Sequence, residues 1–557
     1  MGFDETEETR YHARAMPKMF IDGQEMEFRP GQTVLSLAHE NDVDVPYFCY
    51  HPGLSIAGNC RMCLVQFEND KGEIQKKPDI SCNMACKPGM KVHTQTESVK
   101  KLQSSVMEFL LLNHPLDCPV CDQAGECWLQ EYYMDYARHP SAMRDHKTEK
   151  PKAVPLGPNV MLDAERCILC TRCVRFCDEV TKTSELTIVN RGGHAEISTF
   201  PSQRLENLYS SNVVDICPVG ALTHRDFRFQ QRVWFLKETE SVCNLCSNGC
   251  NTYVDANAVD RQAYRIRPRH NDAVNAYWMC DIGRGAYKPV NAPTRSQHPV
   301  VAGAKATWDA AAGAVAAGLV GLKADAIAAV TSPYSTNENL WAFRRFVWDA
   351  LKSTQVAAEV SPQAESHAKG DDFLLKADRT PNRQGLDAVF SAADSIHFDA
   401  VREGIDAGRI KALFILEADI VRLAKSPDDI RALLAKVPLV VYFATHLDET
   451  AAASKVVLPA ATFVEMDGTF TNHAGRVQRI KPAFAPLYES RPSWAIAEYL
   501  ATTLAPAARL TWKKAEDVFA DLASRVPAFG GLTYARVGDQ GALLNGAAAT
   551  TQPVART

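Results

Sequence analysis

Apolar and polar residues alternate near the N-terminus in a pattern that predicts a small sheet. Met19-Phe20-Ile21 and Met26-Glu27-Phe28 flank Asp22-Gly23, a pair typical of the type I′ turn in a β-hairpin. A short amphipathic helix is expected next, because Val34, Leu37 and Ala38 recur at helical spacing. The pattern therefore predicts a hairpin, a helix and then a cysteine-rich loop.

A longer helix is predicted after this first module. Its apolar positions repeat with helical spacing at Val99, Leu102, Val106, Phe109 and Leu110. Thr94-Gln95-Thr96-Glu97 is interpreted as a capping box at its start, with Thr94 as the N-cap. The polar, proline-containing stretch 141–158 is interpreted as a linker.

The pattern changes from about Ala302 onward. Alanine-rich helical stretches alternate there with short apolar runs, of which 412–416 and 439–443 are examples. Such alternation predicts an α/β domain with a mainly parallel sheet. The tail, 536–557, is rich in Gly, Ala and Thr and is expected to be flexible.

Composition places the chain among globular proteins with several domains. It has 557 residues, of which 46% are hydrophobic and 23% charged. The net charge of −5 gives no reason to expect nucleic-acid binding. The longest uncharged run, 310–322, is shorter than the roughly 20 residues of a membrane-spanning helix. The acidic start, MGFDETEETR, lacks the apolar core of a signal peptide, so a reducing compartment is expected.

The cysteines carry the candidate chemistry. All 17 lie within the first 280 residues, and residues 281–557 contain none. Disulfides are unstable in a reducing compartment, so tight groups of cysteines there indicate metal or redox chemistry.

The first group suits a [2Fe–2S] cluster, which takes four ligands. It consists of Cys49, Cys60, Cys63 and Cys82. Cys86 competes for the last position, but Cys82 is preferred because it immediately follows a predicted strand. The long loop between the first two thiols fits a zinc site poorly. With the preceding hairpin and helix, the group indicates a small ferredoxin module.

The second group contains three thiols and a histidine. It consists of His114, Cys118, Cys121 and Cys127. Three thiols leave one iron of a [4Fe–4S] cluster without a protein ligand, and the nearby imidazole of His114 is the predicted fourth donor. A neutral imidazole in place of a thiolate removes a negative charge, which should raise the reduction potential.

The third group matches the bacterial [4Fe–4S] run, in which a remote Cys-Pro supplies the last ligand. It consists of Cys167, Cys170, Cys173 and Cys217. Cys177 would ligate a second cluster in a two-cluster ferredoxin. The partner positions of that cluster are Asn207, Ser210 and Val213, so Cys177 is interpreted as a small buried side chain.

The fourth group suits either zinc or a [4Fe–4S] cluster, and the three upstream groups favour the cluster. It consists of Cys243, Cys246, Cys250 and Cys280. Setting aside Cys86 and Cys177 and adding His114 leaves sixteen ligands, as four clusters need. Four arginines lie next to these thiols in the sequence: Arg61, Arg166, Arg172 and Arg175. Their positive charge would favour the reduced form of a cluster. The simpler interpretation of each one is a solvated surface residue.

The groups, in this order, resemble one family. The segments HPLDCPVCDQAGEC (114–127), RCILCTRCVRF (166–176) and DICPVGAL (215–222) are similar to the large iron–sulfur subunit, the 75 kDa-type or G-type subunit, of proton-translocating NADH:quinone oxidoreductase, respiratory complex I. The C-terminal half resembles a shortened molybdopterin-oxidoreductase domain, through Val457-Leu458-Pro459, Glu465, Gly468-Thr469, Asn472 and Gly475-Arg476-Val477-Gln478.

The resemblance implies a multidomain fold, α+β followed by α/β. Its expected parts are a β-grasp [2Fe–2S] ferredoxin module (18–97), a [4Fe–4S] module with one histidine and three cysteine ligands (98–140), a ferredoxin-like [4Fe–4S] module (141–235), a molybdopterin-oxidoreductase-type [4Fe–4S] module (236–292), a shortened molybdopterin-oxidoreductase-like α/β domain (293–535) and the tail (536–557).

The resemblance also implies an electron relay with one [2Fe–2S] and three [4Fe–4S] clusters, no molybdopterin and no catalytic side chain. The fourth cluster would lie off the main electron path. Expected partners are an NADH-binding flavoprotein subunit, a small [2Fe–2S] subunit and the quinone-site subunits, in a peripheral arm on the cytoplasmic face of the bacterial inner membrane. The alternative is the iron–sulfur subunit of an NAD-linked formate dehydrogenase or of a hydrogenase-type complex. The lack of any cysteine after Cys280 argues against both, because their catalytic metals need further ligands.

Overall fold

A computed structural model describes residues 16–141, 143–358, 369–391, 395–508 and 510–547. The chain divides between Trp234 and Phe235 into two compact units, each considered by itself. The acidic start of the chain, on which the signal-peptide prediction rests, and residues 548–557 of the predicted tail lie outside the described residues. Among the helices of these ranges, none has the length and apolar character needed to cross a membrane.

The first unit begins with a five-stranded sheet of order β2-β1-β5-β3-β4. The predicted hairpin is confirmed: Asp22 and Gly23 have φ values of 48° and 84°, as a type I′ turn requires. Helix α2 (Val34–Glu40), capped by Thr33, packs its apolar face against the sheet. The strands are β1 (Lys18–Ile21), β2 (Gln24–Glu27), β3 (Leu64–Phe67), β4 (Asp79–Ile80) and β5 (Lys91–His93).

Helix α3 (Glu97–Leu112) follows this module and packs against α4 (Trp128–Tyr136). Its N-cap is Thr96, whose hydroxyl accepts a hydrogen bond from the backbone N–H of Val99 at 3.2 Å. The predicted capping box with Thr94 as N-cap is wrong. The backbone N–H of Thr94 donates instead to Asp22 at 2.8 Å, which ties the start of the helix to the hairpin turn.

The rest of the first unit is built from short elements around loops. A three-stranded sheet has the order β10-β7-β6, and β8 and β9 form a separate antiparallel pair. These elements are β6 (Val154–Pro155), β7 (Val160–Leu162), β8 (Leu186–Val189), β9 (Glu196–Thr199), β10 (Leu222–His224), α5 (Arg172–Arg175), the π-helical turn η3 (Phe176–Val180) and α6 (Asn212–Asp215). In the predicted linker, Lys147 donates to the carbonyls of Leu111 and Leu112, so this stretch is anchored to the end of α3.

The second unit opens with an antiparallel sheet of order β11-β12-β13, followed by a short helix. These elements are β11 (Lys237–Val242), β12 (Asn251–Asn257), β13 (Gln262–Pro268) and α7 (Asp281–Arg284). A second antiparallel sheet, β21-β22-β23, lies later in the chain and comprises β21 (Gly468–Thr471), β22 (Arg476–Ile480) and β23 (Ala542–Leu543). β22 supplies residues that meet the loop between β11 and β12.

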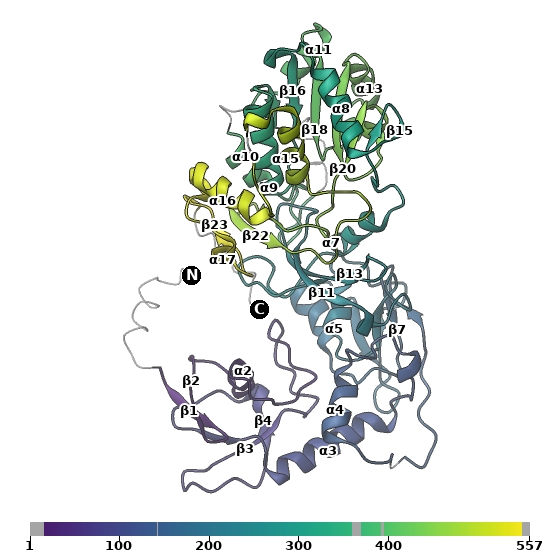
Figure 1. Ribbon diagram of the computed structural model, residues 1–557. Coiled ribbons are helices and arrows are strands. Elements are labelled where there is room, and N and C mark those ends of the chain that lie inside the picture. The colour runs from purple at the N-terminus through teal and green to yellow at the C-terminus, as the bar shows by residue number, and fades with distance from the viewer. Residues whose placement is uncertain (1–15, 142, 359–368, 392–394, 509, 548–557) are drawn as a thin grey trace. The chain divides into compact units, whose positions relative to one another are not determined.

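A seven-stranded sheet of order β15-β14-β20-β19-β18-β16-β17 forms the centre of the second unit (Figure 1). Strands β16 to β20 are parallel, which confirms the predicted mainly parallel sheet, and β14 runs antiparallel to β20. The strands are β14 (Val300–Val301), β15 (Ala304–Lys305), β16 (Ile327–Val330), β17 (Val356–Ala357), β18 (Ala412–Leu416), β19 (Leu439–Ala444) and β20 (Val456–Pro459).

Helices cover both faces of this sheet because its strands are apolar on both sides. Along β18, Phe414 points into one apolar cluster and its neighbours Leu413 and Ile415 into another. The first cluster is closed by α8 (Trp308–Leu319), α9 (Asn337–Arg345), α10 (Arg383–Val389), α15 (Ser493–Leu504) and α16 (Ala515–Arg525). The second is closed by α11 (Phe398–Asp406), α12 (Ile420–Leu423), α13 (Pro427–Leu434) and α14 (Glu449–Ala452).

The predicted flexible tail is wrong for residues 536–547. Helix α17 (Tyr534–Val537) and strand β23 belong to the fold, because Val537 and Leu544 are buried in the first apolar cluster. Backbone pairing of Leu543 with Arg476 adds β23 to the sheet of β21 and β22. A composition rich in small residues indicated flexibility, but these few apolar side chains order the segment.

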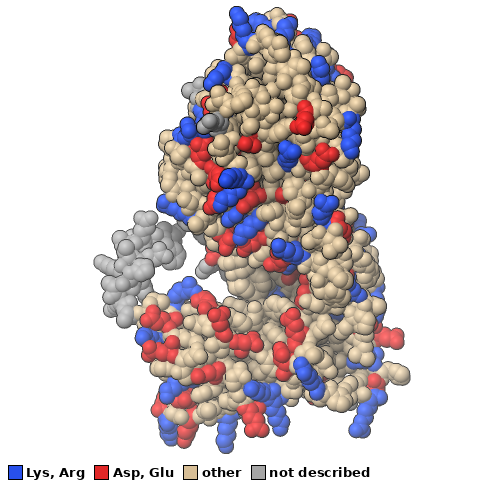
Figure 2. Space-filling view, viewed as in Figure 1, with Lys and Arg blue, Asp and Glu red and all other residues tan. Residues whose placement is uncertain are grey.

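Charged side chains of both signs are interspersed over the surface displayed in Figure 2. Over the first sheet they include exposed ion pairs such as Lys18–Glu25, with an N–O distance of 2.6 Å. Pairs of this kind contribute little to stability, because solvent screens them. Buried apolar clusters therefore contribute more to the stability of each unit than these exposed ion pairs do.

Candidate metal centres

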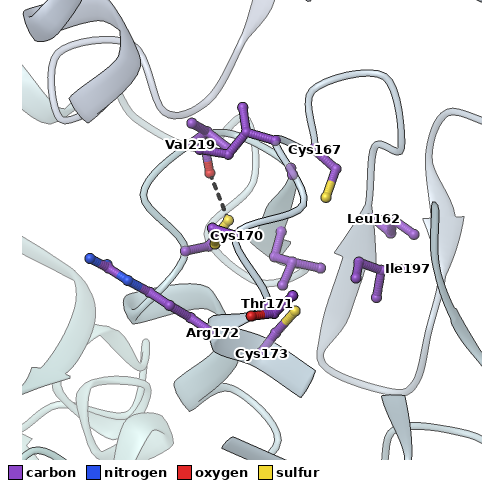
Figure 3. A pocket seen from close by; sticks show the side chains of 12 residues that line it. Leu162, Cys167, Cys170, Thr171, Arg172, Cys173, Ile197 and Val219 are labelled. Atoms are coloured by element: carbon purple, nitrogen blue, oxygen red, sulfur yellow. Dashed lines mark hydrogen bonds between the residues drawn. The ribbon is translucent and has the colours of Figure 1, made fainter. Parts of the chain in front are cut away.

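The third cysteine group lines a single cavity in the first unit. Cys167, Cys170, Cys173 and Cys217 surround it together with apolar residues that include Leu162 and Ile197 (Figure 3). Leu169 and Thr171 have φ values of 55° and 66°, and these left-handed turns wind the backbone around the thiols. The Cys217 thiol donates to the carbonyl of Val219 at 3.1 Å, the dashed line in Figure 3.

Burial decides the protonation of these four thiols in the metal-free chain. It raises the pKa of Cys167 and of Cys217 to about 12. Four thiols in an apolar cavity become thiolates only if a positively charged group balances them. An iron–sulfur cluster supplies that balance, so the donor set and its surroundings fit the group. Cys177 is fully buried in η3 and does not line the cavity.

The second group borders a larger cavity of about 540 Å³, lined by His114, Cys118 and Cys127. Burial, assisted by the positive charge of Arg166, lowers the pKa of His114 to about 4. The imidazole is therefore neutral at physiological pH and keeps a lone pair for a metal. Cys118 is exposed, whereas Cys121 and Cys127 are buried.

The loop that carries Cys217 also touches the second group. A Cβ atom on Gly220 would lie 2.3 Å from the Sγ of Cys121, so only glycine fits there. In the same loop, the carbonyl of Pro218 accepts from the backbone N–H of Trp128, which follows Cys127, at 3.1 Å. The Cys217–Gly220 segment therefore packs between the second and third groups. Glycine directly after Cys-Pro-Val was a signal in the sequence that spacing arguments missed.

Arg166 lies in the same region and is only 5% exposed. It donates to Asp117 through Nε at 3.2 Å and through an Nη at 2.9 Å, and Lys152 reaches the same carboxylate at 2.6 Å. A hydrogen bond from Lys152 is the main reason that the pKa of Asp117 is lowered. The interpretation as a solvated surface arginine is wrong for Arg166. It is also wrong for Arg172, which is 2% exposed.

The first group forms two thiol pairs. The Cys60 thiol hydrogen-bonds to Cys49 and lowers the pKa of Cys49. Cys82 hydrogen-bonds to Cys63 and lowers the pKa of the Cys63 thiol in the same way. The backbone N–H of Cys49 also donates to the Sγ of Cys60 at 3.4 Å. All four predicted ligands therefore have a thiol neighbour from the group.

Cys86 shares an apolar cluster with Cys63 and Cys82, but burial rather than a neighbouring thiol sets the pKa of its own thiol. It is buried in the apolar cluster below the first sheet, and burial raises the pKa of its thiol to about 11. Its backbone N–H pairs with the carbonyl of Gln32 at 2.9 Å, beside α2. Cys82 instead lies in the turn η1 (Ser81–Asn83), which Ser81 fixes through two hydrogen bonds to the carbonyl of Cys63.

The first three groups meet in one apolar cluster of the first unit, here called the thiol core. Its members come from segments more than 100 residues apart and include ligands from each group: Phe48, Cys49, Met62, Met107, Cys127, Leu129, Ala137, Cys170, Val219 and Ala221, with Cys60, Cys167 and Cys217 packed against them. The fold therefore brings members of three ligand sets to one core.

The fourth group lies in the second unit. Cys243, Cys246 and Cys250 occupy the loop between β11 and β12, and Cys280 is the N-cap of α7. The Cys280 Sγ accepts from the backbone N–H of Gly283 at 3.4 Å. A Cβ on Gly283 would lie 3.1 Å from the Sγ of Cys243, so glycine permits this close approach.

Amide side chains hold the loop of the fourth group. Asn248 donates to the Sγ of Cys250 at 3.1 Å. Gln478, from the motif that resembles molybdopterin oxidoreductases, donates to the carbonyl of Gly249 at 2.8 Å and accepts from Asn251 at 2.9 Å. Asn472, of the same motif, donates to the carbonyl of Asn248 at 3.1 Å. This motif therefore supports the fourth cysteine group.

Glu465 of the motif pairs with Arg295 at 2.7 Å, and both side chains are buried.

Among the described residues, no group of three or more His, Cys, Asp or Glu side chains is arranged to hold a single metal ion.

Four family models match the chain. They are described as a 2Fe-2S iron-sulfur cluster binding domain (15–97), the NADH-ubiquinone oxidoreductase-G iron-sulfur binding region (103–141), the ferredoxin-like domain of NADH-quinone oxidoreductase subunit 3 (157–223) and molybdopterin oxidoreductase (241–503). The modular organisation is therefore confirmed, with one 2Fe-2S module, 4Fe-4S-binding regions and a molybdopterin-oxidoreductase-type region.

Similar proteins span most of the chain. The mitochondrial NADH dehydrogenase [ubiquinone] iron-sulfur protein 1 of Solanum tuberosum is 31% identical over 87% of this chain and 79% of its own length. The G-type subunit of NADH-quinone oxidoreductase from Rickettsia bellii is 37% identical over 60% of this chain and 48% of its own length. A chain of the NAD+-reducing [NiFe]-hydrogenase structure covers 39% of this chain and 92% of that chain at 29% identity, with a TM-score of 0.35. This chain belongs to the family of the large iron–sulfur subunit, the 75 kDa-type or G-type subunit, of NADH:quinone oxidoreductase.

Proposed function

We propose that this chain relays electrons from an NADH-binding flavoprotein subunit toward the quinone-site subunits of complex I. The observation that carries the proposal is the thiol core, where ligands from three groups meet. Iron–sulfur clusters held by these ligands accept and donate single electrons. The role of the chain is to hold the ligands close together, exclude water and set the local charge.

The proposed ligand assignment follows the four groups. Cys49, Cys60, Cys63 and Cys82 hold a [2Fe–2S] cluster, and the mixed five-stranded sheet with α2 packed on it supports the β-grasp module. Three [4Fe–4S] clusters are held by the other sets: His114, Cys118, Cys121 and Cys127; Cys167, Cys170, Cys173 and Cys217; and Cys243, Cys246, Cys250 and Cys280. The neutral, half-buried imidazole of His114 supports its place among the ligands.

We place the fourth site off the main electron path. Its four cysteines belong to the second unit, and its loop is held by Asn472 and Gln478 of that unit. Members of each of the first three ligand groups instead share the thiol core in the first unit. The position of the fourth site in a different unit supports a role for it outside the main electron path.

We propose that the α/β domain binds no molybdopterin. In a doubly wound sheet, ligands bind outside the carboxyl ends of the strands where the strand order reverses, here between β16 and β18. Glu417 follows β18 and accepts from Asn339 at 2.9 Å, while Glu338, at the start of the helix after β16, accepts from the backbone N–H of Thr469 at 2.7 Å. Both carboxyl groups already accept hydrogen bonds from within the fold in this region, so the donors around them are not free to bind the phosphate of a pterin cofactor.

The family supplies the proposed setting. The partners are the flavoprotein subunit, the small [2Fe–2S] subunit and the quinone-site subunits, in a peripheral arm on the cytoplasmic face of a bacterial inner membrane. The α/β domain would serve as a docking scaffold for neighbouring subunits.

Metal analysis combined with EPR tests the proposal. Purified full-length protein is assayed for iron, acid-labile sulfide and zinc, then reduced with dithionite and examined by EPR. We expect iron and sulfide in the proportion of one [2Fe–2S] to three [4Fe–4S] clusters, with signals of both kinds. Stoichiometric zinc without reducible clusters would overturn the proposal.

A further inference from the structure

Arg172 makes contacts beside ligands of three different groups. It lies between Cys170 and Cys173 at the start of α5. Its guanidinium donates to the carbonyl of Tyr50, next to Cys49, at 2.6 Å and to that of Ile216, next to Cys217, at 3.0 Å. It also lies 4.6 Å from the ring centroid of Trp128, which follows Cys127.

The charge of Arg172 is buried without an acidic partner. Within the described ranges, no carboxylate forms an ion pair with it, and its Nε has no hydrogen-bond partner. Arg166, in the same unit, pairs with Asp117. Burying a guanidinium among carbonyl groups and rings costs free energy unless negative charge lies nearby. The thiolates of the ligand groups are the negative charges that this core supplies.

Arg172 is one of the residues that line the cavity of the third group, but its guanidinium points away from the thiols. Figure 3 shows the side chain leading away from the thiols of Cys167 and Cys173. Its hydrogen bonds and ring contact take it toward Tyr50 and Trp128, in the segments of the first and second groups. The charge is therefore placed where three ligand segments meet.

We propose that Arg172 is a positioning residue shared by the first three metal sites, and that its charge raises the reduction potential of all three. This inference rests on the proposed function, because it requires clusters at those sites. Reduction adds negative charge to a cluster, and a nearby fixed cation favours the reduced form. The two carbonyl contacts also fix the backbone beside Cys49 and Cys217, which links the geometry of one site to that of another.

Arg175 provides a matched comparison on the same helix. It donates to the carbonyls of Cys49 and Ser55, both in the first group's loop, and to the hydroxyl of Thr171 at 3.2 Å. None of these bonds reaches a segment of the second group. Arg175→Gln should therefore leave the potential of the second site unchanged, whereas Arg172→Gln should lower it.

The test is an EPR-monitored redox titration of the full-length protein, with iron and sulfide analysis. Arg172→Gln is expected to move the midpoint potentials of the first three clusters to more negative values and to leave the fourth unchanged. Arg172→Lys, which keeps the charge on a shorter reach, should give a smaller shift in the same direction. A shift confined to the third site, or no shift, would overturn the inference.

Variants that lose clusters are also decisive. Joint loss of the first three clusters with the fourth retained supports the shared role, whereas loss of the third alone contradicts it. The wild-type iron content tests the proposed function separately. Wild type without clusters refutes that function, while a loaded wild type beside insensitive Arg172 variants refutes only this inference.

Discussion

The two units of the chain build their interiors in different ways. In the second unit, two apolar clusters cover both faces of the seven-stranded sheet and contain no cysteine. In the first unit, the thiol core includes Cys49, Cys127 and Cys170 among its buried members. The α/β domain of the second unit is stabilised by its own side chains, and the buried cysteines of the fourth group lie outside its two apolar clusters. The first contains buried groups that need a metal partner, so its folding is expected to depend on its clusters.

Removal of iron should give the largest difference in protease resistance between the two units. Chelation of reduced protein is expected to expose the first unit to protease while the seven-stranded sheet and its covering helices stay protected, because cluster binding contributes directly to the folding of the first unit. Limited proteolysis with mass spectrometry locates the cuts, and reconstitution with iron and sulfide is the control. Equal loss of protection in both units would contradict the comparison.

Phe414→Ala tests whether the second unit depends on its own apolar side chains for stability. Phe414 is fully buried and packs edge-on against Phe346, with ring centroids 5.4 Å apart. Its truncation should destabilise the second unit by about 3–5 kcal/mol, measured by urea unfolding. The EPR signals of the first three sites should be unchanged. Their loss would show that the first unit depends on the interior of the second.

Buried carboxyl groups predict a pH dependence for the second unit. Burial raises the pKa of Glu338 from 4.5 to about 7. The folded protein therefore holds this proton more tightly than the unfolded chain, and stability falls as pH rises from about 4.5 to about 7, by on the order of 3 kcal/mol.

Glu338→Gln should remove this part of the pH dependence, measured as urea unfolding at pH 5 and pH 8. Asp428→Asn, at a side chain that is 94% exposed, is the control and should leave the slope unchanged. A Glu338→Gln protein whose stability falls as steeply as that of wild type would contradict the assignment.

Gly220→Ala tests, at a single contact, how closely the first unit packs around its metal ligands. The new Cβ would lie 2.3 Å from the Sγ of Cys121, and overpacking of this kind costs about 1–3 kcal/mol. We expect the EPR signal of the second site to be weakened or lost. Gly193→Ala, where a Cβ meets open space, is the matched control. Full occupancy of the second site in Gly220→Ala would refute the role of this close approach.

Local chemistry explains what could be predicted from the sequence. The Asp22-Gly23 turn and the strands around Phe414 and Val441 follow from short-range patterns, and the spacing of the cysteines separates them into groups. The grouping itself needs no tertiary information. The assignment of ligands to clusters remains a prediction.

Long-range contacts explain what could not be predicted. Arg172 reaches Tyr50, which is 122 residues away in the chain, and Gly220 meets Cys121 in the same unit. Neither partner is visible in local composition, so the sequence favoured a surface position for Arg166 and Arg172. The prediction for residues 536–547 of the tail was wrong because a few apolar residues, among them Val537, outweigh the content of small residues.

Paired cysteine variants in the assembled complex test most directly whether electrons flow through the first three sites and bypass the fourth. Cys246→Ala should remove one [4Fe–4S] signal and leave NADH-driven quinone reduction near the wild-type rate. Cys170→Ala should remove a different [4Fe–4S] signal and abolish quinone reduction. An inactive Cys246→Ala complex, or an active Cys170→Ala complex that lacks its cluster, would contradict the account.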